Sequence, residues 1–246
     1  MRIEAEPGFL LHSTPYRETS LLVDLYTKNH GRIRCVAKGF RKPNKKGISR
    51  PIFPYTEHQF SWQGRGELKT LTKADAVQAP VQLQGICLFT GLYLNELFYR
   101  LLQEQDMHQY LYQQYQNFIA ILCKGEPDEV QLRHLEMTLL EELGYGLVLD
   151  SDAQTGLPLQ ADSYYQYIPE QGLQLSINQN SQSQGSPAQG SYLGSDLINI
   201  ARGEFSQGSP LRTAKQLLRS VIDFYLGGRP LHSRELYRQH LLSQTS

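Results

Sequence analysis

The residues best suited to chemistry in this sequence are cations that gather between Lys28 and Arg50, a stretch without aspartate or glutamate. They are Lys28, Arg32, Arg34, Lys38, Arg41, Lys42, Lys45, Lys46 and Arg50. Lysine and arginine neutralise phosphates and release counterions, which dominates sequence-independent DNA affinity. A charge run by itself is more typical of a solvated loop, so the placement of the cations must decide between these interpretations.

Apolar and cationic residues alternate from Arg32 to Lys38, as they do in a half-buried strand. One strand face carries Ile33, Cys35 and Ala37, so the cations of the segment share the opposite face. The remaining cations follow in a loop. This placement favours nucleic-acid contact, and we predict a DNA-binding set of Arg32, Arg34, Lys38, Arg41, Lys42, Lys45, Lys46 and Arg50.

Aromatic side chains beside cations form the usual platform on which single-stranded bases stack. Most aromatics of this region are expected to lie in a core, because alternation does not place them on an exposed face. Phe40 is the best candidate for base stacking, since it lies inside the basic run.

The sequence contains no Gly-x-Ser-x-Gly, phosphate-binding Walker loop or His-Glu-x-x-His motif. Its three cysteines are widely separated, which predicts buried reduced thiols and neither a disulfide framework nor a zinc cage. We therefore expect a protein that is not an enzyme and has no cofactor or metal. A small hydrolase with a histidine and an acid in the helical part stays open as a rival, because catalytic triads assemble from distant residues.

The elements that must position the cations are strands in the first 80 residues. Leu21, Val23 and Leu25 alternate with more polar residues, and two further strand patterns, 53–62 and 67–73, flank a glycine turn at 64–66. About five short strands with a long basic connection favour a small closed barrel of the OB type. Pro80 marks the expected boundary.

Helical periodicity begins at residue 81. The first predicted helix has an apolar stripe of Ile86, Phe89, Tyr93, Leu97 and Leu101. A second helix is predicted over about 108–122. A third begins near Asp128 and ends at Gly144, with a stripe of Leu132, Leu135, Leu139, Leu140 and Leu143.

The last hundred residues are more varied. Residues 150–177 indicate turns and short strands, and the Gln/Ser/Gly-rich segment 178–191 indicates a mobile loop. A strongly amphipathic helix follows, with a stripe of Ala214, Leu217, Leu218, Val221, Ile222 and Tyr225. A short helix over Ser233 to Leu241 completes an α+β fold: an OB-fold DNA-binding domain over 1–80 and a mostly helical partner-binding domain over 81–246, with an irregular β region at about 150–192.

Formal net charge is zero, yet the charges are unevenly distributed. Residues 1–80 hold 14 Lys and Arg against 7 Asp and Glu, whereas 81–246 hold 10 against 17. This asymmetry predicts different partners for the two parts. No run of about 18 apolar residues and no secretory signal pattern is found, so a soluble, cytoplasmic protein is expected.

Arg133 lies beside the apolar stripe of the third predicted helix. Helical spacing allows it to pair with Glu129 or Glu136. The alternative is an arginine beside a hydrophobic groove, which suits an acidic peptide with an aromatic end. The sequence leaves both interpretations open.

Several segments, in order and in register over nearly the whole chain, resemble the RecO family of bacterial recombination mediators. They are Phe9-Leu10-Leu11-His12-Ser13 with Tyr16-Arg17-Glu18-Thr19-Ser20, Gly31-Arg32-Ile33-Arg34 through Gly39, Gly64-Arg65-Gly66-Glu67-Leu68-Lys69-Thr70-Leu71, Gly91-Leu92-Tyr93-Leu94-Asn95-Glu96-Leu97, Leu132-Arg133-His134-Leu135-Glu136 with Leu143-Gly144-Tyr145-Gly146, and Leu226-Gly227-Gly228-Arg229-Pro230 with Ser233-Arg234-Glu235-Leu236.

The resemblance implies an OB fold that binds single- and double-stranded DNA, annealing of complementary strands, and association with RecR. It also implies loading of recombinase onto strands coated by single-stranded-DNA-binding protein (SSB), without nucleotide hydrolysis, and association with the nucleoid. Arg133 would bind the acidic SSB C-terminal tail, and Arg32, Arg34 and Lys38 would contact DNA. An OB-fold RNA-binding protein is the alternative, because a cationic barrel does not select the sugar without a 2′-hydroxyl contact.

Some relatives in this family carry a four-cysteine zinc site after the Gly-Tyr segment. This chain has Asp150, Ser151 and Asp152 there and no cysteine beyond Cys123. We therefore expect no zinc, and we expect packing alone to hold this region.

Overall fold

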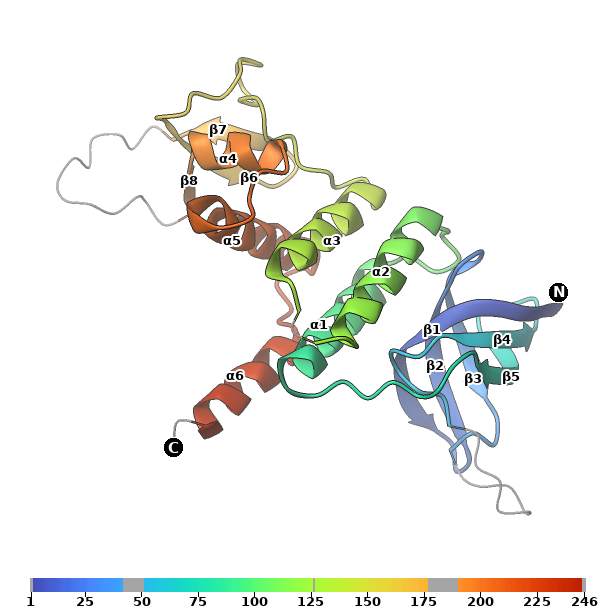
Figure 1. Ribbon diagram of the computed structural model, residues 1–246. Coiled ribbons are helices and arrows are strands. Elements are labelled where there is room, and N and C mark those ends of the chain that lie inside the picture. Colours follow the sequence, from blue (N-terminus) through green and yellow to red (C-terminus); the bar gives the residue numbers. More distant parts are fainter. Residues whose placement is uncertain (1, 42–50, 126, 177–189, 245–246) are drawn as a thin grey trace. The chain divides into compact units, whose positions relative to one another are not determined.

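The computed structural model describes residues 2–41, 51–125, 127–176 and 190–244 (Figure 1). The chain forms two compact units. The barrel unit comprises Met1–Pro127 and Pro230–Ser246, and the second, here called the α5 unit, comprises Asp128–Arg229. Each unit has its own set of buried apolar side chains.

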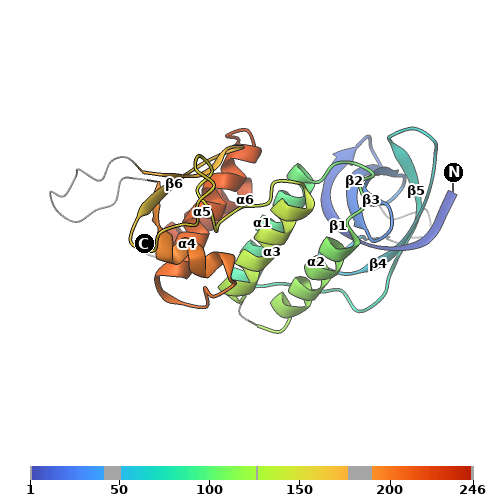
Figure 2. The ribbon, with the colours of Figure 1, turned by 90° about the horizontal axis from the view of Figure 1, so that it is seen from above.

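Five strands close into a barrel in the order β1-β2-β3-β5-β4 (Figure 2). Four of the five pairings are antiparallel, and the parallel pairing of β3 with β5 closes the circle. The predicted α+β class with an OB-like barrel is thus confirmed. Closure of the barrel removes exposed strand edges. The strands are β1 (Arg2–Tyr16), β2 (Ser20–Thr27), β3 (Gly31–Ala37), β4 (His58–Gln63) and β5 (Lys69–Ala76).

The alternation predicted for β3 is confirmed. Ile33, Cys35 and Ala37 lie in the barrel core, together with Phe60 and Trp62. Burying each large apolar side chain contributes about 1.5–3 kcal/mol, so the core fixes the register of β3. That register leaves Arg32 and Arg34 on the outer face of the barrel.

Three helices belong to the barrel unit: α1 (Gly85–Leu101), α2 (Gln109–Leu122) and α6 (His232–Gln244). The stripe predicted for α1 was largely wrong, since of its members only Leu97 is buried. The helix instead buries Cys87, Thr90, Gly91, Leu94, Asn95, Leu97 and Phe98. Apolar residues surround α1 almost completely, so periodicity does not select one face; Phe89 and Tyr93 contact α6 instead.

Aromatic side chains join the barrel to α1 and α2. Tyr26 of β2 makes an edge-to-face contact with Phe98 of α1 at 5.5 Å and with Tyr115 of α2 at 5.8 Å between ring centroids. Phe9 of β1 approaches Tyr115 at 5.2 Å. Such geometries add to the gain from burial. The barrel and these two helices therefore share one aromatic core.

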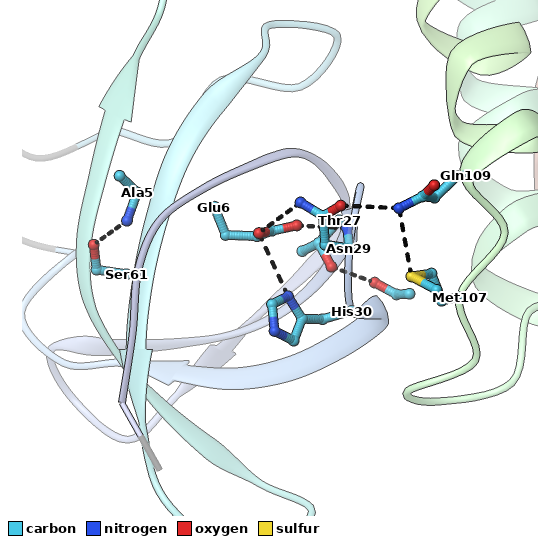
Figure 3. Close-up of polar contacts among 9 residues, drawn as sticks. Ala5, Glu6, Thr27, Asn29, His30, Ser61, Met107 and Gln109 are labelled. Carbon is cyan, nitrogen blue, oxygen red and sulfur yellow. Dashed lines mark hydrogen bonds and ion pairs between the residues drawn. The ribbon is translucent and has the colours of Figure 1, made fainter.

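A buried carboxylate fixes the β2–β3 turn (Figure 3). Glu6 of β1 accepts hydrogen bonds from the backbone N–H of Asn29 at 2.6 Å and from its amide at 3.2 Å, and it lies 3.4 Å from Nδ1 of His30. Gln109 at the start of α2 donates to Oδ1 of Asn29. The turn that precedes the cationic strand is thus held from both the barrel and α2.

Glu96 of α1 anchors the beginning of α6. Its carboxylate accepts hydrogen bonds from the backbone N–H groups of His232 and Ser233 at 2.9 and 2.8 Å, and from the Ser233 hydroxyl at 2.7 Å. The first N–H groups of a helix have no partner within the helix, so a remote carboxylate satisfies them and complements the helix dipole.

The α5 unit contains helices α3 (Glu129–Glu142), α4 (Gly194–Ala201) and α5 (Gly208–Tyr225), and a sheet ordered β7-β6-β8. Its strands are β6 (Tyr164–Ile168), β7 (Gly172–Leu175) and β8 (Ser191–Leu193). Helix α3 begins near Asp128 as expected, and the Asp128 side chain caps it. The buried stripe of α5 matches the prediction except that Tyr225 is only half-buried. Most of the predicted 178–191 loop lies outside the described residues, although Ser191 already belongs to β8.

The region after Gly144 is not held by packing alone, which corrects our expectation. Asp152 is buried and its carboxylate accepts hydrogen bonds from the backbone N–H groups of Gln154, Thr155 and Leu175 and from the Thr155 hydroxyl, at 2.8–3.0 Å. A carboxylate offers about four acceptor sites, and here they tie the loop to β7.

The compact units do not follow the expected division at residue 80. Helices α1, α2 and α6 group with the barrel, whereas Asp128–Arg229 forms the other unit. The shared aromatic core explains why α1 and α2 group with the barrel, and α6 joins them through its contacts with α1. That residues 1–80 fold as a domain by themselves stays a prediction.

Candidate nucleic-acid interface

The outer face of β2 and β3 carries both cations and a buried carboxylate. Asp24 lies opposite Arg34 in the strand register. Its Oδ1 accepts a hydrogen bond from Nη1 of Arg32 at 2.8 Å and lies 3.5 Å from Nε of Arg34. Burial raises the pKa of Asp24, although Arg34, Arg32 and His12 oppose that shift. The predicted row of cations is therefore partly neutralised.

Arg32 is the more enclosed of the two arginines, with 13% of its side chain exposed against 37% for Arg34. It donates from Nε to the carbonyl of Leu102 at 3.0 Å and lies 3.4 Å from Glu104. The backbone of Arg32 also accepts a hydrogen bond from Gln105. Arg32 thus ties the barrel to the segment after α1, which leaves it poorly placed for phosphate.

Exposed cations gather at the end of the barrel where β3 finishes. Lys38 and Arg41 follow the strand and are exposed, and Lys38 makes no ion pair within the described residues. The backbone N–H of Arg41 donates to the carbonyl of Thr19, and its guanidinium donates to the carbonyl of Arg17. The β1–β2 hairpin therefore contributes Arg17 to this cationic end, a residue that the sequence analysis did not select.

Phe40 does not have the exposure expected of a base-stacking residue. Only 7% of its surface is accessible, and it packs in the barrel core with Leu71, Phe60 and Trp62. Burial of an apolar ring outweighs its position within a polar run. Lys42, Lys45, Lys46 and Arg50 lie outside the described residues, so their placement stays a prediction.

Arg133 forms the salt bridge that spacing allowed. Its Nη1 lies 2.8 Å from the carboxylate of Glu136, and the exposed side-chain fractions are 8% for Arg133 and 0% for Glu136. Glu129 pairs instead with Lys215 of α5 at 2.7 Å. Both members of the Arg133–Glu136 pair are buried in the α5 unit, so a peptide would have to compete with Glu136 for the guanidinium.

Other classes of site find no support in the described part of the chain. Over residues 2–41, 51–125, 127–176 and 190–244, no three His, Cys, Asp or Glu side chains are grouped so as to hold a metal ion. No described helix has the length and apolar character needed to cross a membrane. The cationic end of the barrel is the best candidate site.

Comparison with known proteins gives a consistent result over both parts of the chain. The family model Recombination protein O N terminal matches residues 1–80, and Recombination protein O C terminal matches residues 84–235. DNA repair protein RecO of Pseudomonas aeruginosa (strain LESB58) is 42% identical over 234 residues, 95% of this chain and 94% of that protein. DNA repair protein RecO of Serratia proteamaculans (strain 568) is 39% identical over 242 residues, with 97% and 95% covered.

Proposed function

The chain belongs to the RecO family of DNA repair proteins, and on that premise we propose that it binds single- and double-stranded DNA and anneals complementary strands. The family gives the general role in DNA repair and recombination. We add a physical step to this role: the protein brings two phosphate backbones together, and base pairing between the strands then forms the duplex.

The observation that carries this proposal is the cationic end of the barrel. Lys38 and Arg41 are exposed there, and the chain continues directly into a segment with four further cations and no acid. Repulsion between two phosphate backbones opposes annealing, and cations between them screen it. Arg34 is half-exposed beside Asp24 and contributes less.

Annealing by this route requires no bond-breaking residue, so we propose a mediator without catalytic activity. In the same proposal the protein works with RecR and helps to load recombinase onto SSB-coated strands, in the cytoplasm and at the nucleoid. Arg133 is the proposed contact for the SSB C-terminal tail. Two features support this contact. Arginine binds carboxylates in a bidentate geometry, and Arg133 lies next to the half-buried Leu132.

The test is fluorescence annealing of complementary oligonucleotides, with and without SSB, at two salt concentrations. We expect acceleration of annealing that weakens steeply with salt, since phosphate contacts release counterions. Activity that is absent, or that does not respond to salt, would remove the proposal. Competition between single-stranded DNA and RNA of the same sequence tests the alternative, an RNA-binding OB protein, which predicts preference for RNA.

A further inference from the structure

The tip of the β1–β2 hairpin has an unusual backbone. Tyr16 pairs with Ser20 to close a loop of three residues, and Arg17, the first of them, has a φ of 55°. Positive φ is uncommon for a residue other than glycine, and such strain gathers at functional sites. The strained conformation holds an arginine at the exposed tip.

The hairpin tip and the segment after β3 form one surface. Two hydrogen bonds of 3.1 Å join them, from the backbone N–H of Arg41 to Thr19 and from its guanidinium to Arg17. Arg17, Lys38 and Arg41 are all exposed, with Glu18 as the carboxylate of the tip. Phosphate contact is favoured here because three cations outnumber one acid.

The same tip carries an aromatic ring. Tyr16 is half-exposed, and the guanidinium carbon of Arg17 lies 5.2 Å from its ring centroid. A cation–π contact at an exposed site is weaker than the stacking of a base on an aromatic ring, so a base can take the place of the guanidinium. The displaced guanidinium then lies within reach of the neighbouring phosphate.

We propose that Tyr16 and Arg17 form a single-strand site, in which an unpaired base stacks on Tyr16 and Arg17 binds the adjacent phosphate. The proposal rests on the proposed function and assigns to Tyr16 the stacking role that buried Phe40 does not fill. Duplex DNA offers no free base face along its length, so this site distinguishes single strands from duplex.

The experiment measures binding of a thymine oligonucleotide and of a blunt duplex to the full-length protein and its variants. Tyr16→Ala is expected to weaken single-strand affinity about 5- to 150-fold, the range for removal of one stacked base, and to leave duplex affinity unchanged. Tyr16→Phe keeps the ring and should restore binding. Tyr110→Ala is the matched control, because Tyr110 is an α2 side chain with 58% of its surface exposed.

Arg17→Gly removes the guanidinium at a position where glycine adopts the observed φ without strain, so the hairpin is retained. It should lower the salt slope of single-strand binding by about 0.7, which corresponds to one phosphate contact. Photocrosslinking of a 5-iodouracil oligonucleotide gives a second readout, with Tyr16 as the expected adduct. If the wild type anneals while Tyr16→Ala binds single strands normally, or loses duplex binding equally, this inference is overturned and the proposed function stands.

Discussion

Asp24 and Arg34 face each other across β2 and β3, with Oδ1 of the carboxylate 3.5 Å from Nε of the guanidinium. The same oxygen accepts a hydrogen bond from Arg32. One buried carboxylate thus restrains two of the cations that the sequence placed on a DNA-binding face. It limits how much of the barrel wall attracts phosphate.

Asp24→Asn should therefore strengthen DNA binding, since Arg34 is exposed enough to reach a phosphate. We expect about fivefold higher single-strand affinity at low salt and a slope steeper by up to about 0.7. Salt titrations of wild type and variant measure both quantities. Unchanged affinity would show that this wall of the barrel makes no DNA contact.

The same substitution has a defined effect on stability. Burial raises the folded-state pKa of Asp24 above its ordinary value of 3.8, so ionisation opposes folding. The stability contributed by the protonated Asp24 side chain is fully present below the unfolded-state pKa and is lost as pH rises through the folded-state pKa. At neutral pH the uncharged Asp24→Asn variant should unfold in urea at a concentration no lower than wild type; clear destabilisation would contradict this sign.

Glu96 should show the opposite pH dependence. Burial alone would raise its pKa, but the hydrogen bonds from Ser233 and His232 outweigh burial and lower it. Stability from this carboxylate is therefore present above its ordinary pKa of 4.5 and lost as pH falls through the folded-state value. The difference in urea-unfolding free energy between wild type and Glu96→Gln should be constant near neutrality and shrink below about pH 4.5. A constant difference down to about pH 3 would argue against the anchoring of α6.

Arg133 requires a variant that separates binding from folding. Arg133→Ala leaves Glu136 buried without this guanidinium, which lowers the free energy of unfolding by about 3–5 kcal/mol. Such destabilisation would itself disturb a nearby binding site. Arg133→Met combined with Glu136→Leu removes both charges and keeps the volume, so stability should change little. We expect this double variant to fold and to lose binding of an SSB-tail peptide in fluorescence anisotropy. Normal peptide affinity at moderate salt would exclude Arg133 as the contact.

Asp152 holds the loop after Gly144 through its hydrogen bonds. Asp152→Ala removes an acceptor of four hydrogen bonds. We expect the α5 unit to lose about 2–4 kcal/mol of its free energy of unfolding. Hydrogen exchange should quicken at Gln154, Thr155 and Leu175. The barrel strands provide the internal control, because their protection should not change.

The periodic parts of the fold could be predicted from sequence because burial imposes a strict spacing. The strand from Arg32 to Lys38 and the helix around Leu217 each have one apolar face, and both were placed correctly. The buried face of α1 was not, since that helix is apolar nearly all round. Helix α4 was not predicted, because eight residues give little more than two turns of periodicity.

The candidate site was harder to predict because the ion-pair partners of its cations come together only in the folded structure. Asp24 lies within a strand whose register with Arg34 is visible only once the hairpin is paired. Glu104, which approaches Arg32, is 72 positions away in the sequence. The hairpin tip with Tyr16 and Arg17 joins the cationic end because Arg41 donates hydrogen bonds to the carbonyls of Thr19 and Arg17, which no local pattern indicates.

The most direct test of the account is the salt dependence of strand annealing by wild type and by Lys38→Ala combined with Arg41→Ala. Arg212→Ala serves as the control, since Arg212 is an exposed cation on α5. We predict slower annealing by the double variant and a single-strand salt slope shallower by about 0.7 for each phosphate that it no longer binds, with the control unchanged. Equal rates and equal slopes for all three proteins would contradict the claim that the cationic end of the barrel brings DNA strands together.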